Sequence, residues 1–269
     1  MRARLVVFPI RGRIWCFSRS ADPSVLASEA SSQATTFKEL RKNISISGKS
    51  FNANAELLVD FVANKMSKAW IGLENAPEGS FKNKIHGLGL RLLSRVKPAE
   101  IFLRSITKEV TRVEVIYPSS LDARLVRRRL RHVAMRGKII HKKYLYGSIS
   151  MLPLTSSFAV LPLPNVPFFW NLFRAYSHWR ALQGSEKLFQ LVSDSSITSA
   201  TDKEENDQND SRNESYSLEP YWVLKPSEEL ENLARHDNDD DGLSQSAIKR
   251  ICKIYDLGTN DVIKYQRLG

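Results

Sequence analysis

Apolar residues recur along the chain at two spacings, which predict strands in some segments and helices in others. Leu5–Phe8 and Ile14–Phe17 are short β-branched and aromatic runs, and the polar, Gly-containing stretch between them is typical of a β-hairpin. Val110–Tyr117 predicts a strand, and residues 157–161 favour another. We therefore expect a small antiparallel sheet that includes an N-terminal β-hairpin.

Helical spacing dominates the rest of the chain. Ser80 is placed to cap a helix that Pro98 ends, and Ser244 is placed to cap a helix near the C-terminus. The apolar spacing predicts helices over 81–96, 98–106, 121–143, 165–192 and 244–255. The predicted fold class is α+β and mostly helical.

The helix predicted over 121–143 is strongly basic. It carries nine Lys or Arg residues and one acid, Asp122, beside a narrow apolar line. A basic amphipathic helix indicates contact with a membrane surface or another polyanion, whereas an ordinary helix with a solvated basic face is the alternative. The candidate contacts to anionic lipid or polyanion are Arg124, Arg127, Arg128, Arg129, Arg131, Lys138, Lys142 and Lys143.

The next segment, residues 144–173, contains no charged residue and no His. It is longer than the roughly 20 residues that a membrane helix needs, but four prolines interrupt it, so we expect no regular helix across it. It either spans the bilayer, re-enters it or lies on its surface, or else forms a buried core strand and loop. The candidate membrane contacts are Leu152, Leu154, Phe158, Leu161, Phe168, Phe169 and Trp170.

Charge divides the 269 residues into two parts of opposite sign. Residues 1–191 hold 31 Lys/Arg and 12 Asp/Glu, a net charge of +19, whereas residues 192–269 hold 9 and 17, a net charge of −8. This asymmetry predicts a basic α+β domain over 1–192 that includes the membrane-associating segment. Residues 193–217 have the composition of an acidic disordered linker, and 218–269 read as a short helical C-terminal tail.

The first 20 residues allow two interpretations. Five arginines precede the first acid, Asp22, and a Ser-rich stretch follows, which is the composition of a mitochondrial presequence. The same residues read as the folded hairpin described above. Import without cleavage would satisfy both.

Candidate catalytic chemistry is sparse. Residues 237–242 match the first half of a calcium-binding EF-hand loop, but Ile248 stands where a bidentate Glu is required. The five histidines are dispersed, none at the spacing of metal ligands, and two cysteines exclude a disulfide scaffold. We therefore predict no catalytic residue, no cofactor, no metal and no enzyme activity.

Several of these segments together resemble a known family. They are Arg4–Phe17, the stretch from Trp70 to Pro77, the helix Phe81–Val96 and the segment from Phe168 to Ala181. They resemble the mitochondrial K⁺/H⁺ exchange-related proteins of fungi and plants over roughly residues 3–192. The resemblance implies a subunit or modifier of a potassium/proton exchange system at the mitochondrial inner membrane, acting with other subunits.

The residues of the uncharged segment indicate that the chain alone does not transport ions. Cation/proton exchange requires an ionisable group at membrane depth, and the uncharged segment supplies none. One interrupted apolar segment also cannot build the repeat architecture of a secondary transporter. We expect an inner-membrane-associated accessory component. The alternatives are a basic RNA- or ribosome-associated organellar protein and a scaffold that acts through the acidic C-terminal region.

Overall fold

The computed structural model describes residues 2–21, 61, 65–66, 68, 70–157, 165–193, 221–235, 238–239 and 242–267. The chain divides into two compact units. We call residues 1–20, 98–144 and 178–269 the sheet unit, and residues 21–97 and 145–177 the hairpin unit. Two long helices, α6 (Ala123–Ser156) and α7 (Val166–Ser193), each contribute a segment to both units.

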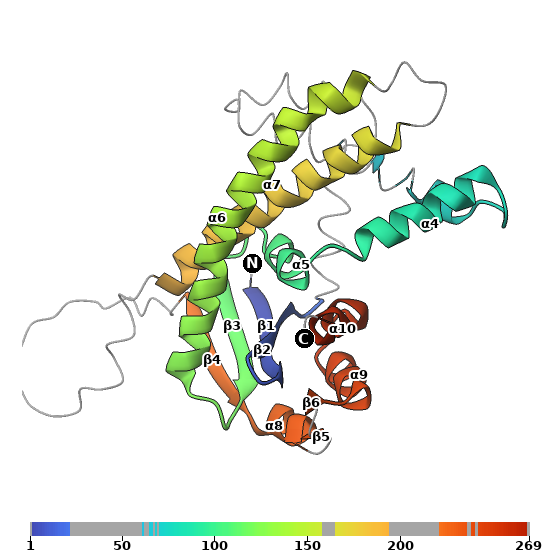
Figure 1. Cartoon of the computed structure of the whole chain (residues 1–269). Helices are drawn as coiled ribbons and strands as arrows, with labels where there is room; N and C mark the ends of the chain where they lie inside the picture. Colours follow the sequence, from blue (N-terminus) through green and yellow to red (C-terminus); the bar gives the residue numbers. More distant parts are fainter. Residues whose placement is uncertain are drawn as a thin grey trace, which may run out of the picture. The chain divides into compact units, whose positions relative to one another are not determined.

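A four-stranded sheet in the order β2-β1-β3-β4 forms the centre of the sheet unit (Figure 1). β1 pairs antiparallel with β2 across a turn in which Gly12 has a φ of 48°, a conformation that favours glycine. β1 also pairs parallel with β3, and β3 pairs parallel with β4. The strands are β1 (Arg2–Arg11), β2 (Ile14–Arg19), β3 (Arg112–Pro118) and β4 (Trp222–Ser227).

The predicted α+β class and the N-terminal hairpin are confirmed. The sheet is mixed rather than wholly antiparallel, because β3 and β4 follow long helical connections of the kind that parallel pairing requires. β4 comes from the segment that the sequence analysis set apart as a C-terminal tail, and the structure makes it an edge strand of this sheet. Residues 158–161 of the further predicted strand lie outside the described residues.

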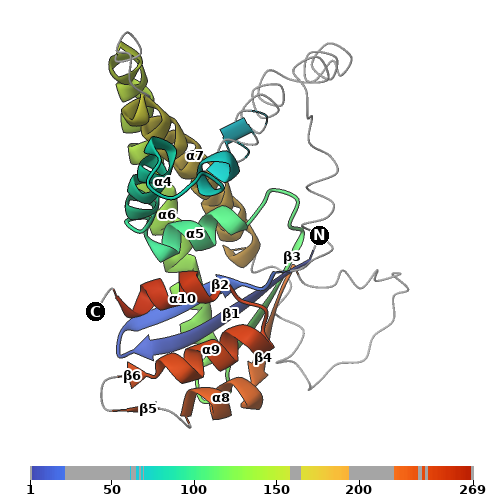
Figure 2. The same ribbon diagram turned by 90° about the vertical axis from the view of Figure 1, so that its right-hand side faces the viewer.

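Helices cover both faces of the sheet (Figure 2). Leu5 and Val7 belong to a core shared with α5 (Pro98–Ser105), α6 and α7, whereas Val6 and Phe8 belong to a core shared with the C-terminal helices. Burial on both faces explains the continuous apolar run of β1, since a strand with one solvated face would alternate with polar residues.

The second core is built from the C-terminal elements. Ser244 caps α9 by accepting a 3.1 Å hydrogen bond from the backbone N–H of Ala247, as its position in the sequence predicts. Cys16 and Cys252 are buried free thiols in this core. The elements are α8 (Glu228–Arg235), β5 (Asn238–Asp239), β6 (Gly242–Leu243), α9 (Gln245–Ile254) and α10 (Thr259–Gln266).

In the hairpin unit, α4 (Phe81–Leu93) begins at the predicted cap, where the Ser80 hydroxyl accepts a 3.2 Å hydrogen bond from the N–H of Asn83. None of the residues of α4 is buried. The expectation that prolines exclude a regular helix from 144–173 is wrong at Pro153, where α6 continues to Ser156. Pro153 lies in the last turn, so the helix loses a single backbone hydrogen bond there.

Two predicted regions lie largely outside the described residues. The acidic linker is described only at Ser193, where α7 ends, and residues 194–217 are not described. The segment Asp237–Gly242, which resembles half of an EF-hand loop, is described only at β5 and Gly242.

A buried carboxylate lies in the central strand of the sheet. Glu114 of β3 accepts ion pairs from Arg2 at 2.8 Å and from Lys225 at 2.7 Å, so cations from both neighbouring strands reach it. Burial alone would raise the pKa of Glu114, but the Lys225 hydrogen bond and the charges of Arg2, Lys225 and Arg4 outweigh it and lower that pKa. The carboxylate is therefore ionised in the folded protein at neutral pH.

We expect Glu114→Gln to lower the free energy of unfolding at pH 7 by about 1–3 kcal/mol, because two cations lose a charged acceptor. A lowered folded-state pKa gives stability that is present at neutral pH and is lost as pH falls through that pKa. The difference from wild type should therefore shrink below about pH 4. Urea unfolding at neutral and acidic pH measures this difference in the free energy of unfolding. The control is Glu78→Gln, because Glu78 is exposed. A difference that does not change with pH would contradict the ion-pair explanation.

Candidate functional site

The basic helix predicted from the sequence is the first part of α6, and the structure separates its cations into two groups. Arg127 and Arg129 are half-buried, whereas Arg124, Arg128, Arg131, Lys138, Lys142 and Lys143 are exposed.

Arg127 and Arg129 are held by the fold. The Arg127 guanidinium lies 4.6 Å from the centre of the Trp222 ring and donates a 3.3 Å hydrogen bond to the carbonyl of Val192. Arg129 lies 4.6 Å from the centre of the Trp15 ring and donates to the carbonyl of Arg13 at 3.1 Å. These cation–π contacts tie α6 to both edge strands of the sheet.

Arg131 and Lys138 also have neighbours within the sheet unit. The Arg131 guanidinium lies 5.8 Å from the Phe189 ring centre, and Lys138 pairs with Glu186 at 3.6 Å. The second pair is half exposed, so solvent screens it and it contributes little stability.

Three of the remaining cations, Arg124, Arg128 and Lys142, share a side of α6 with exposed apolar residues. Positions 124, 128, 135, 139 and 142 are separated by three, four or seven residues, which places them on one side of the helix. Met135 and Ile139 are both exposed, Ile139 to 67%. We call Arg124, Arg128, Met135, Ile139 and Lys142 the basic face.

In the hairpin unit, the uncharged segment forms the C-terminal end of α6 (145–156) and the N-terminal end of α7 (166–173). The Asn165 carboxamide caps α7 by accepting from the N–H of Phe168 at 3.0 Å, and it donates to the carbonyl of Thr155 at 2.9 Å. Asn171 donates to the carbonyl of Ser148 at 3.0 Å. Two amide side chains thus join the helices into a helical hairpin, residues 145–156 and 166–177.

Several of the predicted membrane contacts lie exposed on this hairpin. Leu154 is 60% and Phe169 is 53% exposed, while Leu152, Phe168 and Trp170 are half-buried. Phe158 and Leu161 lie outside the described residues. The structure adds exposed apolar residues that the sequence analysis did not single out, namely Tyr146, Ile149 and Met151.

Within the described part of the chain, none of the helices combines the length and the apolar character needed to cross a membrane.

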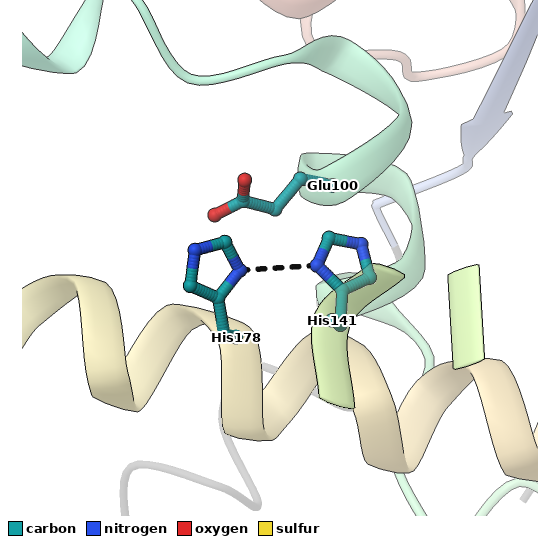
Figure 3. Close-up of side chains that lie close together, drawn as sticks. All are labelled: Glu100, His141 and His178. Atoms are coloured by element: carbon teal, nitrogen blue, oxygen red, sulfur yellow. Dashed lines mark hydrogen bonds between the residues drawn. The ribbon is translucent and has the colours of Figure 1, made fainter. Parts of the chain in front are cut away.

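A cluster of ionisable side chains is buried in the sheet unit. His141 of α6 and His178 of α7 face each other with their Nδ1 atoms 3.0 Å apart, and the carboxylate of Glu100 from α5 lies beside them (Figure 3). One ligand atom from each of the three residues lies within 4.8 Å of the others. Among the described residues this is the group of His, Cys and acidic side chains that could hold a metal ion.

The sequence analysis missed this cluster, because 37 residues separate the two histidines along the chain. A signal was present in the periodicity of α6. His141 continues the series of buried positions Val126, Leu130, Ala134 and Gly137, which recur every three or four residues. A polar residue on the apolar stripe of a helix indicates a buried polar contact, although not its partner.

Two glycines allow the three helices to approach one another. A Cβ added to Gly184 of α7 would lie 1.8 Å from the carbonyl oxygen of Leu103 in α5. A Cβ on Gly137 of α6 would lie 2.5 Å from the end of the Leu103 side chain and 2.6 Å from the Ser185 hydroxyl. Although glycine is a weak helix former, α7 continues past Gly184 to Ser193.

These observations describe an α+β protein with a mixed sheet, a basic helix face and a largely apolar helical hairpin. The chain belongs to the family of mitochondrial K⁺-H⁺ exchange-related proteins, whose sequence model matches residues 4–192. This confirms the resemblance noted in the sequence and relates the chain to mitochondrial K⁺/H⁺ exchange. The match ends in the last turn of α7, before β4 and the C-terminal helices.

The chain is also similar to two fungal proteins. It is 34% identical over 143 residues to an uncharacterized protein of Schizosaccharomyces pombe, covering 50% of this chain and 62% of the relative. It is 28% identical over 183 residues to an uncharacterized protein of Saccharomyces cerevisiae, covering 54% and 56%. The chain thus spans about three fifths of the curated relatives it matches. No solved structure matches it.

Gly184→Ala should destabilise the protein by about 3 kcal/mol or more, because the added methyl group meets backbone that cannot rotate away. Gly137→Ala should cost less, since the atoms it meets are side-chain ends. Gly147→Ala of α6 is the control. A Cβ there meets nothing within 4 Å, so this change should be neutral or stabilise by up to about 1 kcal/mol. Thermal unfolding measures all three. Equal effects at Gly184 and Gly147 would contradict the close approach of α5 and α7.

Proposed function

We propose that the protein is a non-enzymatic accessory component of mitochondrial K⁺/H⁺ exchange, a subunit or modifier, and that it acts at the surface of the inner membrane. The family relates the chain to the exchange system. The observation that carries the membrane role is the helical hairpin, which has no charged residue over 145–156 and 166–173 and exposes large apolar side chains.

The exposed side chains of the hairpin suit the boundary between headgroups and acyl chains. Leu154 and Phe169 present aliphatic and aromatic surface to solvent, and such surface gains about 25 cal/mol per Å² when it leaves water. Tyr146 adds an aromatic ring with a polar tip, a combination favoured at membrane interfaces.

The basic face supports the same location. Each Lys or Arg near an anionic surface contributes on the order of 1 kcal/mol. Lys142 and Lys143 directly precede the uncharged segment in the sequence, so anionic headgroups that meet the hairpin would also meet these cations. Exposed Met135 and Ile139 give the basic face the mixed character of interfacial helices.

The proposal assigns transport itself to other subunits. Residues 144–173 carry no carboxylate that could alternate between K⁺ and a proton.

Membrane contact through the hairpin can be measured with the purified full chain and vesicles of phosphatidylcholine and cardiolipin. We expect the chain to cosediment with the vesicles. Leu154→Asp with Phe169→Asp should weaken the partitioning at least tenfold, because two apolar side chains that would enter the membrane become charged. The matched control is Tyr221→Asp with Ile254→Asp, an aromatic and an aliphatic residue exposed to 44% and 45% in the sheet unit. Equal loss in both variants would contradict a hairpin-specific contact, and so would no binding by wild type.

The exchange role can be measured by potassium-acetate swelling of mitochondria that lack the protein. We expect swelling to be lost, restored by wild type and by a synthetic K⁺/H⁺ exchanger, and poorly restored by Arg124→Gln, Arg128→Gln and Lys142→Gln together. Three lost cations correspond to about 3 kcal/mol, roughly a hundredfold in membrane binding.

The matched control for this triple variant removes three exposed cations elsewhere, Lys249→Gln, Lys253→Gln and Arg267→Gln, and should restore swelling. Arg127 and Arg129 are kept in both variants because they pack on Trp222 and Trp15. Normal swelling without the protein would overturn the exchange role and favour the RNA-associated alternative, which binding of the basic face to organellar RNA would then test.

A further inference from the structure

We propose that Glu100, His141 and His178 form a binding site for a divalent transition-metal ion, best matched by Zn²⁺. All three side chains are at least 94% buried, and they come from three different helices of the sheet unit (Figure 3). The proposal concerns this cluster alone and does not depend on the membrane or exchange role.

The donor set determines the class of ion. Two imidazole nitrogens and one carboxylate oxygen are one of the ligand sets that bind Zn²⁺ through three protein groups, and the same set also binds non-haem Fe²⁺. The alkali and alkaline-earth cations prefer sites made of oxygen ligands, so K⁺, Mg²⁺ and Ca²⁺ match this cluster poorly. Three protein ligands leave one tetrahedral position for a water molecule or another small ligand.

The geometry is close to that of a metal site. Two nitrogens bound about 2.05 Å from a tetrahedral Zn²⁺ lie roughly 3.3 Å apart. The Nδ1 atoms of His141 and His178 are 3.0 Å apart, so ion binding requires the rings to separate slightly and to rotate until both lone pairs point at the ion, and the Glu100 oxygen, within 4.8 Å, to move closer. Each ring rotates about its own side-chain bonds, so this adjustment requires no movement of α6 or α7.

The same two nitrogens can share a proton when no metal is bound. One ring then donates from Nδ1 and the other accepts, which requires opposite tautomers. Metal binding through both Nδ1 atoms replaces this bridging proton, which moves to the Nε2 of its own ring, so that both imidazoles remain neutral. The site therefore has a hydrogen-bonded closed form and a metal-bound form with nearly the same helix positions.

An aromatic ring covers the cluster. Tyr144 stacks on His178 with ring centres 5.3 Å apart and planes at 22°, and the tyrosine itself is exposed. A bound ion would join α5 to α6 and α7 where Gly137 and Gly184 bring them together, and would stabilise that contact by mass action.

The test uses the full chain, freed of metal with a chelator and titrated with ZnCl₂ against a chromophoric competitor. We expect one equivalent of Zn²⁺ to bind and to raise the unfolding temperature. His141→Gln and His178→Gln should each weaken Zn²⁺ binding at least a hundredfold, and Glu100→Gln at least tenfold. His132→Gln is the matched control, because His132 is exposed on the same helix, and it should bind as wild type does.

A second measurement does not rely on variants. Zn K-edge absorption of the wild-type complex should report two imidazole ligands, and Co²⁺ in place of Zn²⁺ should give the visible absorption of a four-coordinate nitrogen and oxygen site. The proposal is overturned if wild type binds no Zn²⁺, if the spectra show no imidazole, or if the three cluster variants bind as His132→Gln does. Vesicle binding and potassium-acetate swelling are separate measurements, so a negative result for metal binding would not contradict the proposed function.

Discussion

The close approach of α5, α6 and α7 is the constraint on which the polar interior of the sheet unit depends. Gly184 lies so near the carbonyl of Leu103 that no side chain fits between the backbones, and Gly137 leaves room for Leu103 and Ser185. Helices packed this closely bring polar side chains on their facing stripes together. Glu100, His141 and His178 meet for that reason, and side chains buried this deeply need hydrogen-bonding or ionic partners.

The central sheet depends on segments that are far apart in the sequence. β3 lies between β1 and β4, and Glu114 on β3 is held by cations from both neighbours. The C-terminal helices cover the face that Val6 and Phe8 present. The family match ends at residue 192, but residues after it bury this face of β1 from solvent. The acidic part of the chain is thus structurally joined to the basic part.

Local features could be predicted from the sequence, and non-local ones could not. Ser80 and Ser244 cap helices through hydrogen bonds to residues three positions on, and the hairpin of β1 and β2 follows from a short turn at Gly12. The parallel pairings of β3, the meeting of His141 with His178 and the packing of Arg127 on Trp222 join segments tens of residues apart. The periodicity of apolar residues shows which face of an element is buried. It does not identify the element that packs on that face.

The arginines of α6 show why the number of cationic residues in a helix overestimates the number available to bind a polyanion. Nine cations in 23 residues indicate polyanion binding, but Arg127 and Arg129 use their guanidinium planes to hold the edge strands through Trp222 and Trp15. Arginine serves both purposes because its planar cation stacks on aromatic rings and remains charged. The cations left for an anionic surface are those opposite the buried stripe. On this helix Arg127 and Arg129 stabilise the fold, and the exposed cations that remain are those available for the membrane contact that we propose.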